Sequence, residues 1–307
     1  MELTTTLRRG DAVIKTKVAS FPLILFCVVA ATVWARDISP IVSTDWLSQN
    51  LDNSRLIVFD IRTAAQYKKG HIPGSLNTPL SVWAVPRNGL TLELPSDEAL
   101  RDLLGKSGVD PSSLVVVVTR IDTDFSRADA TRVAWTIMLA GVKNVALLNG
   151  GYNKWVSDHK AISTETVNAI PKTYAGKMDR SLLAEKKYVL GRIGKSILVD
   201  ARTPEDYFGM TSKPGHIKSA VNMPTPWVFA SDGTFIKEGD LRAMASGVLG
   251  TNKSKEVIVY CAVGGYASTW WFVLTQVLGY QNVKLYDGSM EEWVKDPSAP
   301  VSTFTWH

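Results

Sequence analysis

Cysteine is scarce in this chain of 307 residues, which carries only Cys27 and Cys261. If Cys27 is removed with an N-terminal segment, Cys261 is the sole thiol of the mature chain and cannot form an internal disulfide. A single cysteine of this kind is either a buried inert thiol or a reactive one. Its place in the sequence therefore matters more than its number.

The chain also lacks an apolar run near its N-terminus that is long enough to span a membrane. Residues 21–33 form an apolar run of 13 residues, whereas a membrane-spanning helix needs ~20. Basic residues precede the run, and Val33-Trp34-Ala35 resembles a small-residue cleavage site, as in a secretory signal peptide. We expect residues 1–35 to be a signal peptide cleaved near Ala35, and the mature protein to be periplasmic or secreted. The alternative is an uncleaved signal that anchors the chain in a membrane.

A strong excess of one charge is absent as well. The formal net charge is +5, from 34 basic and 29 acidic residues. Residues 1–35 contain four of the basic and two of the acidic residues, so cleavage leaves 30 against 27, a net charge of +3. This balance is too mild to indicate a nucleic-acid partner.

What the chain does contain is an internal repeat. Residues 56–80 and 197–224 share an apolar run, Asp, Arg-Thr, a Tyr five residues after the Arg, then Gly-His-Ile, Asn and Pro. Residues 114–155 and 256–293 share an apolar strand, a turn, a helical stretch, Gly, a second strand and a terminal Trp. Two copies of one unit are therefore expected, in residues 36–162 and 180–307, joined by a polar linker in residues 163–179.

Each copy alternates between strand-like and helix-like segments. The strand-like runs are apolar throughout, which is typical of strands buried on both faces. Alternation of this kind predicts an α/β fold in which each domain is a mostly parallel sheet flanked by helices. We expect strands at residues 56–61, 115–119, 145–148, 197–201, 257–260 and 283–286, and helices at 97–105, 126–140, 182–190 and 267–278.

Cys261 follows the expected strand 257–260 and precedes a glycine-containing turn and a helix. Ligands of open parallel sheets bind beyond the carboxyl ends of the strands. Backbone N–H groups and the helix dipole at such a point stabilise an anion, which predicts a lowered thiol pKa and a cradle for an anionic substrate. No His lies nearby in sequence to act as a base. We expect Cys261 to be catalytic, with the substrate contacted by the loop residues Ala262, Val263, Gly264, Gly265 and Tyr266.

The ordered motifs resemble the rhodanese family as a tandem over nearly all of residues 40–300. They are Val-Asp-Ala-Arg, Gly-His-Ile, Val-Asn-Met-Pro, Val-Tyr-Cys-x-x-Gly and Asp-Gly-Ser-x-x-x-Trp. The resemblance implies a sulfurtransferase without cofactor or metal. A small sulfur-containing anion such as thiosulfate would load Cys261 as a persulfide, and cyanide, a thiol or a protein acceptor would take the sulfur. It also implies that Arg202 lines the substrate pocket. Trp83 and Trp227 follow the Asn-x-Pro segments of the two copies and are candidates for the rim of an interdomain cleft, where Trp227 is a candidate substrate contact.

Three departures from the family pattern limit this interpretation. The first copy has Thr119 where the second has Cys261, so the first domain is expected to be inactive. The family often has cationic residues directly after the cysteine, but here they are Ala262 and Val263. The loop also does not read Cys-Gly-Ser-Gly, as mercaptopyruvate-type loops do, so the donor stays open and thiosulfate is the default.

The repeat offers an internal control, because features present in both copies are expected to be structural. This applies to the His and Asp residues of the shared motifs and counts against a substrate role for Arg202, which the family resemblance favours. An alternative function is a sulfane-sulfur carrier that forms a persulfide without turnover. A phosphatase is disfavoured because the loop end, Tyr266-Ala267-Ser268, has no arginine to bind phosphate.

Overall fold

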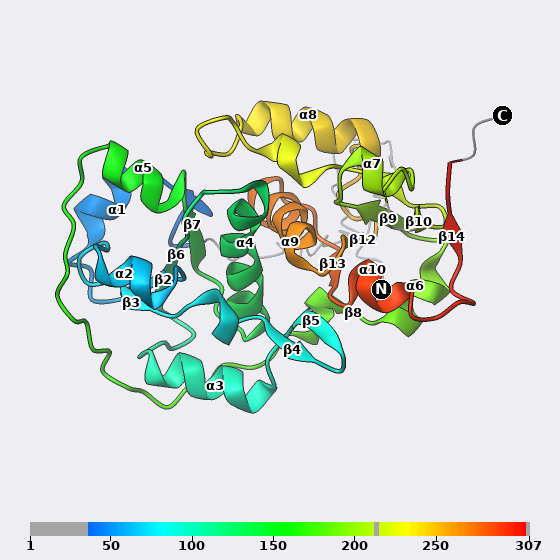
Figure 1. Ribbon diagram of the computed structural model, residues 1–307. Coiled ribbons are helices and arrows are strands. Elements are labelled where there is room, and N and C mark those ends of the chain that lie inside the picture. Colours follow the sequence, from blue (N-terminus) through cyan, green and yellow to red (C-terminus); the bar gives the residue numbers. More distant parts are fainter. Residues whose placement is uncertain (1–35, 212–214, 305–307) are drawn as a thin grey trace, which may run out of the picture. The chain divides into compact units, whose positions relative to one another are not determined.

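A computed structural model describes residues 36–211 and 215–304. The predicted signal peptide, residues 1–35, lies outside the described residues. Two five-stranded sheets dominate the described chain, and every pairing within them is parallel. This confirms the predicted fold class of an α/β chain with two mostly parallel sheets flanked by helices (Figure 1).

The first sheet has the strand order β1-β7-β6-β2-β3 and belongs to the first repeat. Its central strand is buried along its whole length, as a run of Leu and Val predicts for a strand covered on both faces. The strands are β1 (Ile41–Val42), β2 (Leu56–Asp60), β3 (Leu76–Asn77), β6 (Leu114–Val118) and β7 (Val145–Leu148).

The second sheet has the strand order β11-β9-β12-β13-β8 and repeats this arrangement. Two antiparallel pairs, β4–β5 and β10–β14, lie outside the two sheets. The second-sheet strands are β8 (Leu183–Ala184), β9 (Ile197–Asp200), β11 (Val221–Asn222), β12 (Val257–Tyr260) and β13 (Val283–Tyr286), and the others are β4 (Val85–Arg87), β5 (Leu90–Glu93), β10 (His216–Ile217) and β14 (Val301–Ser302).

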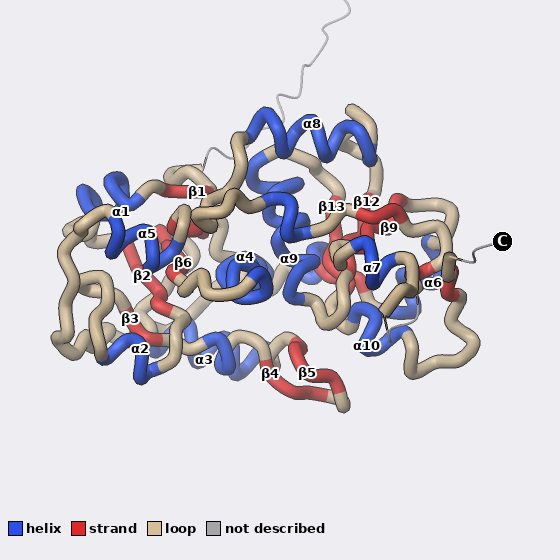
Figure 2. The backbone as a smooth tube through the Cα atoms, turned by 45° about the horizontal axis from the view of Figure 1, so that its top comes forward, coloured by secondary structure: helices blue, strands red, loops and turns tan. Residues whose placement is uncertain are grey.

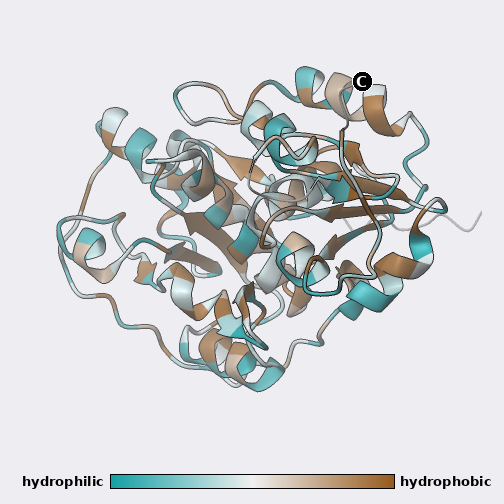
Figure 3. Ribbon diagram, turned by 45° about the vertical axis from the view of Figure 1, so that its right-hand side comes forward, coloured by the Kyte–Doolittle hydropathy of each residue, from teal (hydrophilic) through white to brown (hydrophobic). Residues whose placement is uncertain are grey.

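Helices cover both sheets, and the hydropathy colouring shows apolar strands between helices with polar outer faces (Figure 3). The α-helices of the first repeat are α1 (Thr44–Asn50), α2 (Ala64–Lys68), α3 (Asp97–Lys106), α4 (Asp124–Leu139) and α5 (Gly151–Ser157). Those of the second are α6 (Lys186–Arg192), α7 (Pro204–Tyr207), α8 (Glu238–Leu249), α9 (Gly265–Phe272) and α10 (Ser289–Trp293). Short 3-10 helices are η1 (Leu80–Val82), η2 (Arg180–Leu182) and η3 (Thr225–Val228), and η4 (Val273–Val277) is a π-helix.

The two repeats meet along α4 and α9, which lie side by side in both views (Figures 1 and 2). Thr131 Oγ1 of α4 lies 2.8 Å from Ser268 Oγ and 2.9 Å from Thr269 Oγ1 of α9. All three hydroxyls are buried. Hydroxyl pairing at such close helix packing satisfies polar groups that would otherwise lose water without compensation.

The six predicted strands are present to within one residue, and two of the predicted helices differ. The helix expected at residues 182–190 begins at Lys186, because Leu183 and Ala184 pair with β13 as the edge strand β8. The helix expected at 267–278 begins earlier, at Gly265, and its last part is the π-helix η4. Local secondary-structure propensity does not predict a two-residue edge strand, because the strand depends on pairing with residues that are distant in sequence.

One tryptophan prediction is wrong for the structure. Trp83, expected at the rim of a cleft, is fully buried against Phe59, with ring centroids 5.2 Å apart. Its indole N–H donates to the carbonyl of Thr78 at 3.1 Å. Trp227 behaves differently and exposes 58% of its surface.

Within residues 36–211 and 215–304, no helix combines the length and apolar character that a membrane span requires.

Candidate active site

Cys261 stands directly beyond the carboxyl end of β12, the middle strand of the second sheet. Its backbone is fixed on both sides. The Cys261 N–H donates to Ser289 Oγ at 3.1 Å, and the Met290 N–H donates to the Cys261 carbonyl at 3.1 Å. The side chain is 1% exposed, so the thiol lies at the floor of the loop rather than on the surface.

The loop that follows turns sharply at Gly264, which has φ +84° and precedes α9. A Cβ there would meet Asp287 Oδ1 at 2.8 Å and Arg132 Nη1 at 3.0 Å. Only glycine combines this left-handed backbone with so close an approach. The turn directs the backbone N–H groups of Val263, Gly264 and Ala267 toward the sulfur of Cys261.

Burial raises the pKa of the Cys261 thiol, and the charge of Asp200 adds to the rise. Hydrogen bonds from the backbone N–H groups of Ala267, Val263 and Gly264 oppose it without cancelling it. The predicted lowered pKa is therefore wrong for this structure. The predicted N–H cradle is present, but the closed loop removes water from the thiolate, and desolvation outweighs the cradle.

Arg202 is paired within the protein. Its Nε donates to Asp200 Oδ1 at 2.9 Å, and its Nη2 donates to the Gly215 carbonyl at 2.6 Å. Arg62 makes the same contacts with Asp60 and the Gly70 carbonyl in the first repeat. This identity favours a structural role for both arginines. Arg202 Nη1 is buried and has no hydrogen-bond partner among residues 36–211 and 215–304. A substrate contact by Arg202 stays a prediction.

The two histidines of the repeated Gly-His-Ile motif also match each other. His71 and His216 stack on Tyr67 and Tyr207, with centroids 3.7 and 3.8 Å apart. In each case Nδ1 contacts the backbone carbonyl of the same tyrosine, at 3.0 and 2.8 Å. The same contacts in both repeats are what a structural role requires.

The remaining predicted contact residues are the loop residues 262–266 and Trp227, and they differ in burial. Ala262, Val263 and Tyr266 are half-buried, while Gly264 and Gly265 are buried. Thr225 Oγ1 donates to the Tyr266 carbonyl at 2.8 Å and so holds η3, with the exposed Trp227, against the loop. Their contact with a substrate stays a prediction.

The first repeat contributes residues to the same site, and the sequence analysis did not identify them. Arg132 of α4 pairs with Asp287, which follows β13, and both side chains are buried. Phe125 of α4 lies over the loop, with its ring centroid 5.3 Å from that of Tyr266. The sequence does carry a signal for Arg132. Arg132 lies nine residues before Gly141, and Trp270 lies nine residues before Gly279, so the two occupy the same position of the repeat. This position therefore differs between the repeats, as the position of Cys261 does.

The β4–β5 hairpin of the first repeat is also fixed beside this loop. The Leu94 N–H donates to Asp287 Oδ2 at 3.0 Å, and the Thr91 N–H donates to Glu291 Oε2 at 2.9 Å. Glu291 in turn donates its N–H to the Ala262 carbonyl at 2.9 Å. The active loop is thus held by both repeats.

A cavity of about 560 Å³ lies between the β4–β5 hairpin and α6, and Asp287 lines it. Glu93 lines it, together with Tyr286 and Glu292. Burial raises the pKa of Glu93 to about 7, and the carboxylate of Asp287 adds to the rise. The lining carries both signs of charge on each side, since Arg87 lies on the hairpin with Glu93, and Lys186 pairs with Asp296 at 3.2 Å.

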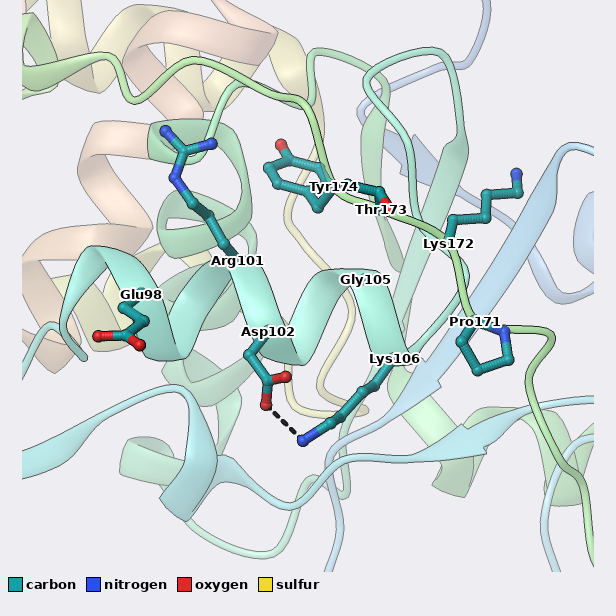
Figure 4. Close-up of a pocket in the computed structure, with 9 residues that line it drawn as sticks. All are labelled: Glu98, Arg101, Asp102, Gly105, Lys106, Pro171, Lys172, Thr173 and Tyr174. Carbon is teal, nitrogen blue, oxygen red and sulfur yellow. Dashed lines mark hydrogen bonds and ion pairs between the residues drawn. The ribbon is translucent and has the colours of Figure 1, made fainter.

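A second cavity, of about 570 Å³, lies between α3 and residues 171–174 of the predicted linker (Figure 4). Its wall carries the exposed ion pair Asp102–Lys106 at 2.7 Å. The described residues show no cluster of His, Cys, Asp and Glu suited to a metal ion. Cys261 does not line this cavity.

The family model for the rhodanese-like domain matches residues 43–158 and 183–296. The chain therefore belongs to the rhodanese-like family, with two such domains, and the predicted family is confirmed.

Relatives of similar length support this assignment. The sulfur carrier protein TtuD of Thermus thermophilus is 32% identical over 282 residues, which is 85% of this chain and 96% of that protein. A Mycobacterium leprae protein named "Putative thiosulfate sulfurtransferase" is 31% identical over 274 residues, again 85% and 96%. The anaerobic ergothioneine biosynthesis enzyme of Chlorobium limicola, solved with trimethyl histidine, has a TM-score of 0.76 at 24% identity and covers 87% of this chain and 70% of that one. That likeness shows the fold alone.

Proposed function

We propose that the protein is a sulfurtransferase that moves sulfane sulfur through a persulfide on Cys261. The observation that carries the proposal is the position of this thiol at the carboxyl end of β12, faced by backbone N–H groups of Val263, Gly264 and Ala267. The relatives named as sulfur carrier and thiosulfate sulfurtransferase support the same chemistry.

The reaction has two displacements. The Cys261 thiolate attacks the outer sulfur of the donor, so that a sulfur–sulfur bond forms at Sγ and the bond within the donor breaks. With thiosulfate as donor, sulfite leaves with the electron pair. An acceptor such as cyanide then attacks the outer sulfur of the persulfide, thiocyanate leaves, and the thiolate is restored. The N–H cradle stabilises the anion at each stage.

Burial of Cys261 has a consequence for this cycle. The thiol is 1% exposed and its pKa is raised, so a donor reaches it only when the loop or the aromatic residues over it move. Because the thiolate is the nucleophile, a thiol that is mostly protonated at neutral pH reacts slowly. Catalysis is therefore expected to be accompanied by loop movement.

The test uses the full chain and a Cys261→Ser variant. The wild type, exposed to thiosulfate, should gain the mass of one sulfur atom on the peptide that contains Cys261 and should form thiocyanate when cyanide is added. The variant should keep the wild-type fold by circular dichroism and lose both signals. Unchanged thiocyanate formation in the variant would disprove the proposal.

A second candidate is a sulfur carrier that passes its persulfide to a partner protein. The uncharged pair Ala262 and Val263 favours it, because no cation of the loop itself pairs with a dianionic donor. A carrier forms one persulfide per chain and shows negligible turnover with thiosulfate and cyanide. Comparing persulfide yield with thiocyanate turnover on the same sample separates the two.

We also propose that the protein acts outside the cytoplasm after removal of residues 1–35. The basic segment and the short apolar run before Ala35 support this proposal. Mass spectrometry of the protein isolated from its source cells would report the mature N-terminus. A chain that retains residues 1–35 would contradict the proposal.

A further inference from the structure

The cavity between the β4–β5 hairpin and α6 lies at the carboxyl ends of β13 and β8 (Figure 1). The last residues of these strands, Tyr286 and Ala184, are paired in the sheet, and both line the cavity. Ligands of open parallel sheets bind at this edge, and a volume of about 560 Å³ is ordinary for a small-molecule site. Cys261 does not line the cavity, so the cavity is distinct from the site of the thiol.

Tyr286 carries a buried hydroxyl that the fold does not use. Its side chain is 1% exposed, and the hydroxyl has no hydrogen-bond partner among residues 36–211 and 215–304. Burial raises the pKa of this phenol, and the carboxylates of Glu292 and Glu93 add to the rise without meeting hydrogen-bond geometry. The hydroxyl therefore faces the two acids that line the cavity with it. An unpartnered buried hydroxyl lowers stability, which favours a ligand as its missing partner.

Glu93 and Glu292 are the inner acids of this cavity. Both are half-buried, the first on the hairpin and the second on α10. Neither carboxylate forms an ion pair within the part of the chain that the structure describes. Burial and then Asp287 raise the pKa of Glu93 to about 7, and Arg132 and Arg87 oppose the rise without cancelling it. A ligand with an ammonium group would supply the missing positive charge.

The exposed rim of the cavity carries unpaired cations. Arg87 of the hairpin and Lys187 of α6 line it, and neither has an acidic partner among residues 36–211 and 215–304. The rim has one exposed acid, Glu185, against these two cations. The other lining cations are paired, Lys186 with Asp296 and Arg180 with Asp97. The unpaired charge is thus negative inside the cavity and positive at its rim, which suits a ligand that carries both charges.

The wall of this cavity also holds the loop of Cys261. Asp287 accepts a backbone N–H of the hairpin at 3.0 Å, and its carbonyl would lie 2.9 Å from a Cβ on Gly264 of the loop. Glu93 belongs to the first repeat, whereas Tyr286 belongs to the second. A ligand bound to both residues favours the arrangement in which hairpin, cavity wall and loop are together. That arrangement is the one in which the thiol is buried.

We propose that this cavity binds a small zwitterion, such as an amino acid, and that the bound ligand holds the loop closed over Cys261. The ammonium group lies against Glu93 and Glu292 and donates a hydrogen bond to the Tyr286 oxygen. The carboxylate of the ligand lies toward the cations of the rim. The ligand is an effector, so no covalent bond forms or breaks, and its binding does not depend on sulfur transfer.

Binding is measured by isothermal titration calorimetry of the full chain at pH 8 with three sulfur-free zwitterions: glycine, 4-aminobutyrate and 6-aminohexanoate. Each is compared with the amine and the carboxylate of its own length, for example hexylamine and hexanoate. At least one zwitterion should bind about tenfold more tightly than both of its partners, as for a hydrogen bond between charged groups. Equally tight binding of the amine, or no binding of any zwitterion, would overturn the proposal.

Variants locate the site. Glu93→Gln and Tyr286→Phe should each weaken binding of the zwitterion about tenfold. Tyr286→Phe should keep the wild-type stability, because the hydroxyl that it removes has no partner in the described chain. Arg87→Gln should weaken the zwitterion and not the amine. The matched control is Glu98→Gln, which removes an acid from the other cavity (Figure 4) and should keep the wild-type affinity. Unchanged affinity in Glu93→Gln and Tyr286→Phe would place the ligand elsewhere and overturn the proposal.

The effect on the loop is measured by alkylation of Cys261 with iodoacetamide, followed by mass spectrometry of its peptide. A saturating zwitterion should slow the reaction at least about twofold, because it stabilises the closed arrangement. Glu93→Gln, at the same ligand concentration, should react at the rate of the ligand-free protein. An unchanged rate in wild-type protein that binds the zwitterion would overturn the role as an effector. Neither measurement uses a sulfur donor, so failure of the proposed sulfur transfer is a separate result.

Discussion

Thr131 Oγ1 of the first domain and Thr269 Oγ1 of the second lie 2.9 Å apart, at the crossing of α4 and α9. Each threonine stands ten residues before the glycine that follows its helix, Gly141 or Gly279. They are therefore the same position in the two repeats. The contact between the domains is centred on a residue paired with its own equivalent.

This pairing predicts coupled stabilities. Thr131→Val should lower the free energy of unfolding by about 1–3 kcal/mol, because it removes the partner of the buried Thr269 hydroxyl. Thr269→Val should cost less, because Thr131 Oγ1 keeps its contacts with Ser268 Oγ and the Ala128 carbonyl. The double variant should lose less than the sum, with a coupling of about 0.5–3 kcal/mol in urea denaturation. The control is Thr136→Val, since Thr136 Oγ1 donates within its own helix, to the Arg132 carbonyl at 3.0 Å. Additive losses for Thr131 and Thr269 would contradict the pairing.

The buried ion pair Arg132–Asp287 should matter far more than an exposed one. Asp287→Ala leaves the Arg132 charge buried without a counter-ion, so we expect a loss of about 3–5 kcal/mol in unfolding free energy. It should also slow persulfide formation, since Asp287 packs against Gly264. Glu238→Ala breaks the exposed pair with Arg242 and should cost at most about 1 kcal/mol. Similar losses in both variants would argue against the pair as an interdomain link.

Gly264 should tolerate no side chain. Gly264→Ala combines a positive φ with a Cβ only 2.8 Å from Asp287 Oδ1, so we expect inactivation and a loss of stability. Gly194→Ala is the matched control, because Gly194 has φ +72° and no neighbouring atom of the described chain lies within 4 Å of its Cβ position. It should cost only the backbone strain, about 1–2 kcal/mol, and keep activity. Calorimetry and thiocyanate assays of both variants would measure the difference, and equal melting temperatures would show that the close approach is unimportant.

Stability should fall as the pH rises through neutrality. Asp129 and Glu93 have pKa values raised to about 7 from ordinary values of 3.8 and 4.5. The folded state therefore binds more protons than the unfolded state between about pH 4 and 7, and the free energy of unfolding decreases over that window. Asp129→Asn and Glu93→Gln should each flatten the decrease and stabilise the protein at pH 8. Denaturation curves from pH 5 to 8 would test this, and a wild-type stability that rises over the range would contradict it.

Much of the fold could be predicted because its signals are local. The strands β6 and β12 are unbroken apolar runs, and each is followed by a turn, a helix and then a glycine, Gly141 or Gly279. The repeat then allowed one copy to serve as a control for the other. That comparison singled out Cys261 against Thr119, and the structure places Cys261 at the end of β12 inside an N–H cradle.

The part contributed by the first domain could not be predicted in the same way. Phe125 and Arg132 are far from Cys261 in sequence, and no local pattern states which residues of α4 meet the loop. Arg132 even resembles an ordinary surface arginine of a helix, although it is 1% exposed. Only the packing of α4 on α9 brings these side chains to the loop.

The sequence by itself determined two repeated α/β units and one distinctive thiol, because periodic burial and strand-end glycines are written into neighbouring residues. The tertiary structure decided the state of that thiol. It buried Cys261 so fully that desolvation outweighs the N–H groups around it, and it occupied Arg202 with Asp200. Burial and ion pairing depend on what every other segment leaves open to water, which no stretch of sequence specifies alone.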